Sequence, residues 1–325
     1  MRIVLVVNSF ASSVTARNTV VVHQVLSRGH DVAIVETSRR GHATRFAQDA
    51  ARRGVDLVVA YGGDGTLNEV ATGVAGTDTA LGVLPGGSTN VFARTLGMPN
   101  DPVAAARLLV VGLNAPDAIR PTGLGRVNGR FFCFHTGVGY DAAVVKAVEK
   151  RASMKRWAGH PLFVWAALKT WLSTYDRRSP HFRVVPDHGE VVEDGYFSIV
   201  LNTSPYTFLG NRPLDLSPAA TLDRALVVVT FNTMRATAIL GSLAGALRGG
   251  GVRPNAHLAL HEDVRSVSIE PVTGSQRRFP YQVDGDYLGE TERLELHHVP
   301  DAVRLAFPAR TLPPWGPAQS SSPSA

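Results

Sequence analysis

Several features that mark large classes of proteins are scarce or missing in this chain of 325 residues. It has a single cysteine, Cys133, which excludes an intrachain disulfide and predicts a reducing compartment such as the cytoplasm. No stretch approaches the ~20 uninterrupted apolar residues of a membrane-spanning helix, so we expect any membrane contact to be peripheral. The apolar run at residues 3–7 is too short for the core of a signal peptide and predicts a first strand.

Charge and repeats are equally modest. A net charge of +6 is too weak and too scattered to predict nucleic-acid binding, but it suits a phosphate-bearing small molecule or an anionic membrane surface. We find no internal repeat. The apolar content of 44% is that of a globular protein, and the length allows about two domains with a large core.

The first third of the chain alternates short apolar runs with helical patterns. This alternation predicts a parallel sheet with helices on both faces, a domain that we place at residues 1–121. The predicted strands are residues 3–7, 31–35, 55–59 and 80–84, and the first helices are residues 15–28 and 43–53.

From about residue 120 the pattern changes to β-rich runs. Asn128 and Gly129 form a hairpin signal, and many further runs of β-formers predict a mostly antiparallel β domain at residues 122–300. Two helical stretches, residues 141–172 and 233–247, interrupt it. Residues 301–308 are a candidate for return to the first domain, and the Pro- and Ser-rich residues 309–325 predict a disordered tail.

The strongest local signal is residues 62–69 (GGDGTLNE), which follow the predicted strand at 55–59. Glycines remove side chains where phosphates could approach the backbone, and a helix start offers free N–H groups. Thr66 and Glu69 have the spacing of a capping box for that helix. Asp64 would repel phosphate unless a cation or a proton lay between them, so the sequence predicts that Asp64 holds Mg²⁺ beside a nucleotide. The alternative is an ordinary Gly-Asp-Gly turn.

A second loop of the same type, residues 85–90 (PGGSTN), follows the next predicted strand and offers the hydroxyl of Ser88. Asn8 and Thr37 come directly after the first two strands. The carboxyl ends of parallel strands meet at one edge of a sheet, where ligands bind. These four separate segments therefore predict one nucleotide site.

With both loops in place, the sequence resembles the diacylglycerol kinase catalytic-domain family, the bacterial soluble lipid kinases related to sphingosine and ceramide kinases. The resemblance rests on residues 62–69 and 85–94, and it continues downstream to about residue 307. The later matching segments are residues 136–141 (TGVGYD), 155–159 (KRWAG) and 282–286 (QVDGD). The motif GGDGT is shared with NAD kinases, whereas Asn68, Glu69 and the second loop favour the lipid kinases.

The resemblance implies a nucleotide site in a cleft between the two domains, with ATP and Mg²⁺ as cofactors. It also implies a structural magnesium loop at residues 220–226, with Asp223 as the side-chain ligand and the carbonyls of Ala220 and Ala225 beside it. It implies Asp286 as the catalytic base, with Asp284 as a supporting neighbour; Asp64 could itself orient the nucleophile, and Asp284-Gly285 could instead be only a turn. The residues implied to bind ATP are Asn8, Thr37, Gly62, Gly63, Asp64, Gly65, Thr66, Leu67, Asn68 and Ser88.

The chain departs from the family pattern at four positions. Ser9 replaces a proline, Ser88 a threonine, Arg224 a glycine and Asp286 a glutamate. The implied activity is transfer of the γ-phosphoryl of ATP to a lipid hydroxyl, most simply diacylglycerol to phosphatidate. Two alternatives stay open: an NAD kinase-like enzyme with a soluble acceptor, and a nucleotide-binding regulatory protein that has lost catalysis.

A lipid substrate would be reached at a membrane surface. The apolar, aromatic stretch at residues 157–172 follows several basic residues, which suits peripheral docking to an anionic bilayer, but a helix packed on the β domain is equally consistent. The expected partners are a diacylglycerol-like lipid and the membrane surface, with no nucleic acid, and the sequence leaves a homodimer open. The expected location is cytoplasmic with peripheral membrane association.

Overall fold

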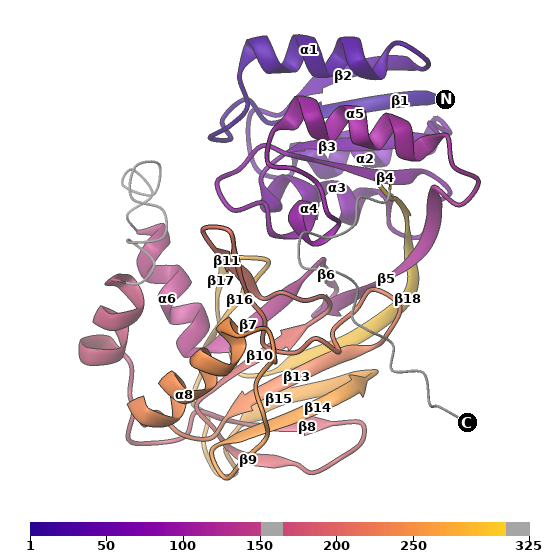
Figure 1. The fold of residues 1–325 in the computed structure, drawn as a ribbon. Helices are drawn as coiled ribbons and strands as arrows, with labels where there is room; N and C mark the ends of the chain where they lie inside the picture. Colours follow the sequence, from indigo (N-terminus) through magenta and orange to yellow (C-terminus); the bar gives the residue numbers. More distant parts are fainter. Residues whose placement is uncertain (151–164, 310–325) are drawn as a thin grey trace, which may run out of the picture.

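The computed structural model describes residues 1–150 and 165–309 of the chain. An α/β region carries the N-terminus, and a region of antiparallel sheets packs below it (Figure 1). The predicted fold class is therefore confirmed.

The N-terminal region is built on four parallel strands in the order β2-β1-β3-β4. Helix α1 packs beside α5, and α2 packs beside α3. Each strand runs directly into a loop at the same edge, because Val7 pairs with Glu36 and Tyr61, and Gly62 pairs with Pro85. The elements are β1 (Arg2–Val7), α1 (Ala16–Leu26), β2 (Asp31–Glu36), α2 (His42–Arg52), β3 (Leu57–Gly62), α3 (Asp64–Val74), β4 (Ala80–Pro85), α4 (Val91–Thr95) and α5 (Pro102–Leu113).

Local sequence explains these elements. Strands β3 and β4 are buried along their whole length, as continuous apolar runs between two helical layers should be. Helix α1 begins where the Thr15 hydroxyl accepts a hydrogen bond from the amide of Asn18, and α5 begins at Asp101 with Pro102 in its first turn. The core of this layer positions the four loops at the carboxyl edge.

The C-terminal region is mostly antiparallel. A six-stranded sheet has the order β14-β13-β10-β7-β16-β17 and is buried on both faces: Val228 belongs to one hydrophobic core, whereas Val227 and Val229 belong to the other. The first strands are β5 (Ile119–Val127), β6 (Arg130–Phe132), β7 (His135–Gly139), β8 (Phe182–Pro186), β9 (Val192–Gly195), β10 (Phe197–Leu201), β11 (Thr207–Leu209) and β12 (Arg212–Leu214). The later strands are β13 (Leu226–Phe231), β14 (Leu258–Val264), β15 (Ser266–Pro271), β16 (Phe279–Val283), β17 (Asp286–Thr291) and β18 (Leu294–Ala306).

Two long strands, β5 and β18, connect the two regions (Figure 1). The first half of β18 pairs with β15, and its end runs parallel to β4, with Arg304 opposite Ala80. Pro121, where the sequence suggests a domain boundary, lies inside β5 and pairs with Arg304. A long β5–β18 ladder, interrupted by one irregularity between Val299 and Val303, thus joins the two regions in place of a flexible linker.

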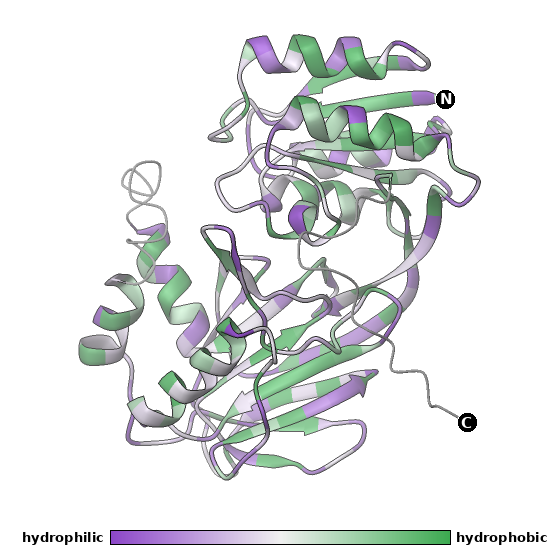
Figure 2. Ribbon diagram, in the orientation of Figure 1, coloured by the Kyte–Doolittle hydropathy of each residue, from purple (hydrophilic) through white to green (hydrophobic). Residues whose placement is uncertain are grey.

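Three helical elements lie together on one side of the C-terminal region, at the left in Figure 1, away from β5 and β18. They are α6 (Tyr140–Glu149), a helical segment from residue 165 that continues into the π-helical turn η1 (Thr170–Thr174), and α8 (Ala236–Leu247). Residues 151–164 of the predicted helical stretch, with the motif at 155–159, lie outside the described residues. Helix α8 is mostly apolar, yet Ala246 is its one buried residue (Figure 2). None of the helices in the described ranges is long and apolar enough to cross a bilayer.

Candidate active site

A cavity of about 990 Å³ lies between the two regions. One wall consists of the loops that follow β1, β2, β3 and β4. The other comes from the C-terminal region, where Phe134, Tyr206 and Asp286 contribute. The convergence of the four strand ends that the sequence predicts is therefore seen in the structure.

The two glycine loops pack against each other, backbone to backbone. The amide of Gly86 donates to the carbonyl of Gly62 at 2.8 Å. A Cβ on Gly86 would lie 2.8 Å from the Cα of Gly62, and a Cβ on Gly87 would lie 2.8 Å from the Cα of Gly63. These glycines are required for the loops to meet, in addition to clearing space for a ligand.

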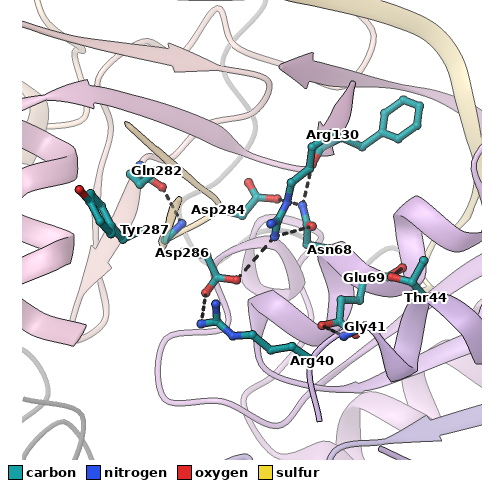
Figure 3. Close-up of polar contacts among 12 residues, drawn as sticks. Arg40, Gly41, Thr44, Asn68, Glu69, Arg130, Gln282, Asp284, Asp286 and Tyr287 are labelled. Atoms are coloured by element: carbon teal, nitrogen blue, oxygen red, sulfur yellow. Dashed lines mark hydrogen bonds and ion pairs between the residues drawn. The ribbon is translucent and has the colours of Figure 1, made fainter. Parts of the chain in front are cut away.

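The predicted capping box is wrong. Helix α3 begins one turn earlier than expected, with Gly63 as its N-cap, and the Thr66 hydroxyl accepts from the side-chain amide of Asn8 at 2.9 Å. The Glu69 carboxylate instead accepts from the amides of Gly41 and Ala43, at 2.8 and 3.1 Å. A tertiary contact has taken the place of the local one, because Glu69 caps the neighbouring helix α2 and holds the loop before it (Figure 3).

Asp64 lines the cavity at the first turn of α3. Its two carboxylate oxygens accept from the amides of Val91 and Phe92, at 3.1 and 3.3 Å, at the start of α4. The side chain therefore ties the two glycine loops together at the same point where the sequence predicts a magnesium ligand. A carboxylate has about four acceptor sites, so this contact and a bound cation are chemically compatible.

Asn68 faces the C-terminal region. It is buried, and its amide nitrogen donates to Asp284 and to the carbonyl of Phe131, each at 2.8 Å. The Asp284 carboxylate also accepts from the amides of Cys133, Phe134 and His135. Burial outweighs these four hydrogen bonds and raises the pKa of Asp284 to about 6. This pair fastens α3 to the turns that flank β7 and β16.

Asp286 starts β17 and lies over the glycine turn. Its carboxylate oxygens would be 3.7 and 3.8 Å from a Cβ on Gly65. Two guanidinium groups flank it: Arg40 lies 3.8 Å from one oxygen and Arg130 lies 3.6 Å from the other (Figure 3). The candidate base of the C-terminal region is thus next to the helix start of the N-terminal region.

The structure sorts the predicted nucleotide residues into two groups. Gly62, Leu67 and Asn68 do not line the cavity: Gly62 packs under Thr66 and the second loop, and the other two are buried in the body of α3. The residues that line it are Asn8, Thr37, Gly63, Asp64, Gly65, Thr66 and Ser88.

A buried polar network lies next to the cavity, and no local signal in the sequence predicts its contacts. Asp141 accepts hydrogen bonds from the Tyr206 hydroxyl and from the Gln282 amide, the latter at 2.8 Å, and burial raises the pKa of its carboxyl group. Gly137 leaves room for it, since a Cβ there would overlap the carboxylate. Residues 136–141 were recognised as a motif, but only the fold shows which partners Asp141 meets.

His135 and Cys133 both have structural roles next to the cavity. The His135 ring packs against Phe134 and Tyr206, and burial lowers its pKa to about 3, so it is neutral. Cys133 is fully buried and unpaired, and burial raises the pKa of its thiol.

The loop at residues 220–226 fits a divalent cation poorly. Asp223 is exposed, and the carbonyl of Ala220 accepts from the amide of Ser204. Arg224 is ion-paired with Asp263, which also accepts from the amide of Ala225. In the described ranges, no three His, Cys, Asp or Glu side chains gather into a metal-binding group. We therefore assign no chemical step to a metal in this loop.

Comparison with known proteins supports the resemblance. The Diacylglycerol kinase catalytic domain family matches residues 2–119. A diacylglycerol kinase of Bacillus subtilis is 42% identical over 113 residues, 34% of this chain and 36% of that protein. A protein named probable lipid kinase YegS-like, of Chromohalobacter salexigens, is 34% identical over 155 residues, 46% of this chain and 48% of that protein. The chain thus spans less than half the length of these two relatives.

Solved structures extend the likeness in fold. A diacylglycerol kinase from Bacillus anthracis superposes with a TM-score of 0.68 at 21% identity, covering 94% of this chain and 96% of the other. Residues 2–119 thus match the diacylglycerol kinase catalytic-domain family that the motifs predicted, and the chain as a whole has the two-region fold of the solved Bacillus anthracis protein.

Proposed function

We propose that this chain is an ATP- and Mg²⁺-dependent lipid kinase that transfers the γ-phosphoryl group to a lipid hydroxyl, most simply that of diacylglycerol. The observation that carries the proposal is the position of Asp286. Its carboxylate, from the C-terminal region, lies beside the glycine turn that begins α3 in the N-terminal region, and both line the same cavity.

The nucleotide half of the cavity suits a polyphosphate. Gly63 and Gly65 expose backbone at the start of α3, and the hydroxyls of Thr66 and Ser88 face the same space. Asp64 is the residue that would hold Mg²⁺, which supplies charge neutralisation of the phosphates when bound. Asn8 and Thr37 complete the strand-end surface on which the nucleotide would lie.

The acceptor half has a different character. Val145 and Val148 of α6, together with Phe134, Phe208 and Leu209, line the same cavity. Apolar walls suit the acyl chains of a diacyl lipid better than a polar nucleotide. This difference favours a lipid acceptor over a soluble one.

In the proposed reaction, the acceptor hydroxyl gives its proton to Asp286 as its oxygen forms a bond to the γ-phosphorus. The bond from that phosphorus to the bridging oxygen of the β-phosphate breaks, and ADP leaves. Asp284 holds the turn that presents Asp286, because its own carboxylate is occupied by four hydrogen bonds.

Membrane association is proposed on a surface formed by the helical elements at one side of the C-terminal region (Figure 1). Its exposed apolar side chains lie beside the cation–π pairs of Lys169 with Trp165 and Arg177 with Trp171. Trp171 also donates to the carbonyl of Met234, just before α8, which joins the two helical elements. We name this the apolar end surface; its members are Trp165, Leu168, Leu172, Leu240 and Leu247.

An acceptor screen tests the proposal. Purified protein is incubated with ATP and MgCl₂ and with diacylglycerol, sphingosine, ceramide, monoacylglycerol or NAD, and the products are identified by mass. We expect phosphatidate in the presence of lipid vesicles. Phosphorylation of NAD alone, or ATP binding without any product, would replace the proposal with one of the two alternatives.

A further inference from the structure

Asp286 is placed between two positive charges that come from different parts of the fold. Arg40 belongs to the loop between β2 and α2, and Arg130 starts β6. Their guanidinium nitrogens lie 3.8 and 3.6 Å from the two carboxylate oxygens, so both oxygens are engaged (Figure 3). While both ion pairs hold, an acceptor hydroxyl has to compete with a guanidinium group at either oxygen of Asp286.

The two arginines are held differently. Arg130 also donates to the side-chain oxygen of Asn68 at 3.3 Å, which fixes its guanidinium beside α3. The side chain of Arg40 is 75% exposed, and within the described part of the chain Asp286 is its one ion-pair partner. Arg40 can therefore turn to a new anion at little cost.

The loop that carries Arg40 is nevertheless fixed at its base. Glu69 of α3 accepts from the amides of Gly41 and Ala43, and the Thr44 hydroxyl donates to the carbonyl of Glu69. The Arg40 backbone is thereby tied to the same helix whose first turn faces the phosphates. A long side chain on a fixed base can swing within the cavity without moving the loop.

Acidic side chains outnumber cationic ones in the lining of the cavity in the described residues. The acidic residues that line it are Asp64, Glu69, Glu149, Asp284 and Asp286. The cationic side chains that line it in the described residues are Arg39 and Arg40, and Arg130 stands behind Asp286. A nucleoside triphosphate that enters this site needs cations near its terminal phosphate, where negative charge also accumulates during transfer.

We propose that Arg40 binds the terminal phosphate of the nucleotide, and that it pairs with Asp286 only until that phosphate arrives. Nucleotide binding then transfers the Arg40 guanidinium from carboxylate to phosphate and frees one oxygen of Asp286 for the acceptor hydroxyl, while Arg130 stays fixed between Asn68 and the other oxygen. The site thus couples exposure of the base to the presence of a γ-phosphate. This inference rests on the proposed function and adds one phosphate-binding residue to it.

Binding measurements without any acceptor test the idea. Calorimetry in MgCl₂ compares a non-hydrolysable ATP analogue with ADP, for the wild type, Arg40→Ala and Arg40→Lys. We expect Arg40→Ala to weaken binding of the triphosphate analogue by at least about tenfold and binding of ADP by much less. Arg40→Lys should have an intermediate effect. Arg45→Ala is the matched control, because Arg45 is an exposed arginine of α2 outside the cavity.

A second variant, Asp286→Asn, should change the affinity for the triphosphate analogue in the opposite direction. In Asp286→Asn the arginines lose their carboxylate partner, so the triphosphate analogue should bind several-fold more tightly than to the wild type. In the double variant with Arg40→Ala most of that gain should vanish, a non-additivity that simple loss of negative charge would not produce.

The outcomes separate the two proposals. If the wild type binds no nucleotide, the proposed function itself fails. If the wild type binds, but Arg40→Ala binds both nucleotides as tightly as the wild type, the phosphate role is overturned. Equal weakening for ADP and the triphosphate, or additive effects in the double variant, would also overturn it.

Discussion

Two aspartates two residues apart show how strongly position decides what a residue does. Asp284 is buried and accepts four hydrogen bonds, whereas Asp286 is partly exposed between two arginines. The sequence predicts that both carboxylates matter, but it cannot tell a structural one from a reactive one. That difference depends on Asn68 and on β6 and β7, which are more than a hundred residues away in the chain.

Asp284 should make the stability of the protein depend measurably on pH. Its pKa in the folded protein is about 6, above the ordinary 3.8, so the folded state binds the proton more tightly than the unfolded state. The stability it contributes is complete below the ordinary value and is lost as pH rises through about 6. The free energy of unfolding of the wild type, measured in urea relative to Asp284→Asn, should therefore rise by about 3 kcal/mol between pH 7 and pH 3.5.

The Asn variant cannot titrate at this position, so the comparison isolates the carboxyl group. Its amide also presents donors to backbone N–H groups, and we expect it to be less stable than the wild type throughout. A difference between the two proteins that stays constant, or shrinks as the pH falls, would show that the hydrogen bonds outweigh burial.

At the scale of elements, the two glycine loops act as one unit. Gly86→Ala would place a Cβ 2.7 Å from a methyl group of Val14 and 2.8 Å from the Cα of Gly62, and the backbone atom cannot step aside. We expect a loss of about 1–3 kcal/mol in unfolding free energy and weaker ATP binding, measured by urea denaturation and calorimetry. Gly29→Ala is the control, because nothing lies within 4 Å of its Cβ position; equal effects in both variants would contradict this packing.

Because the loop at residues 220–226 fits a cation poorly, we expect Mg²⁺ alone not to stabilise the protein. Arg224 already supplies a cation there through its pair with Asp263. The melting temperature without nucleotide should therefore be the same in EDTA and in excess Mg²⁺. With ATP present, Mg²⁺ should stabilise the protein. The gain in unfolding free energy should be about 2.7 kcal/mol when the concentration of the Mg–ATP ligand is about 100 times its Kd. A higher melting temperature with Mg²⁺ alone would contradict this and would indicate a metal site without nucleotide.

Elements were largely predictable from the sequence, and contacts between them were not. Continuous apolar runs identified β1, β3 and β4, because buried parallel strands need them. Local spacing suggested that Thr66 and Glu69 cap one helix, yet Glu69 reaches α2 instead. Arg40 and Arg130 carry no motif of their own, and only the meeting of two regions makes them neighbours of Asp286.

At the scale of the whole molecule, the paired strands β5 and β18 set the cavity between the two regions. Helix α6 packs against the helical segment at residues 165–174, which carries part of the apolar end surface, and its Val145 and Val148 line that cavity. In the proposed function, docking by this surface brings the cavity close to the membrane that holds the lipid acceptor.

Vesicle binding tests this surface. Replacing Leu168, Leu172 and Leu240 with serine removes exposed apolar area while leaving the cavity intact, and we expect binding to anionic vesicles in a sedimentation assay to fall by at least about tenfold. The matched control replaces Val20 and Val111, which are exposed on α1 and α5, with serine. Equal losses in both variants, or none in the first, would place the membrane contact elsewhere.

The central claim is that Asp286 accepts a proton from a lipid hydroxyl beside the phosphate-facing turn. The most direct measurement is transfer of labelled γ-phosphate from ATP to diacylglycerol in vesicles, by the wild type and by Asp286→Asn. The wild type should form labelled phosphatidate, and the variant should be slower by a factor of about 10²–10⁴ while still binding ATP. Near-normal transfer by Asp286→Asn would contradict the account.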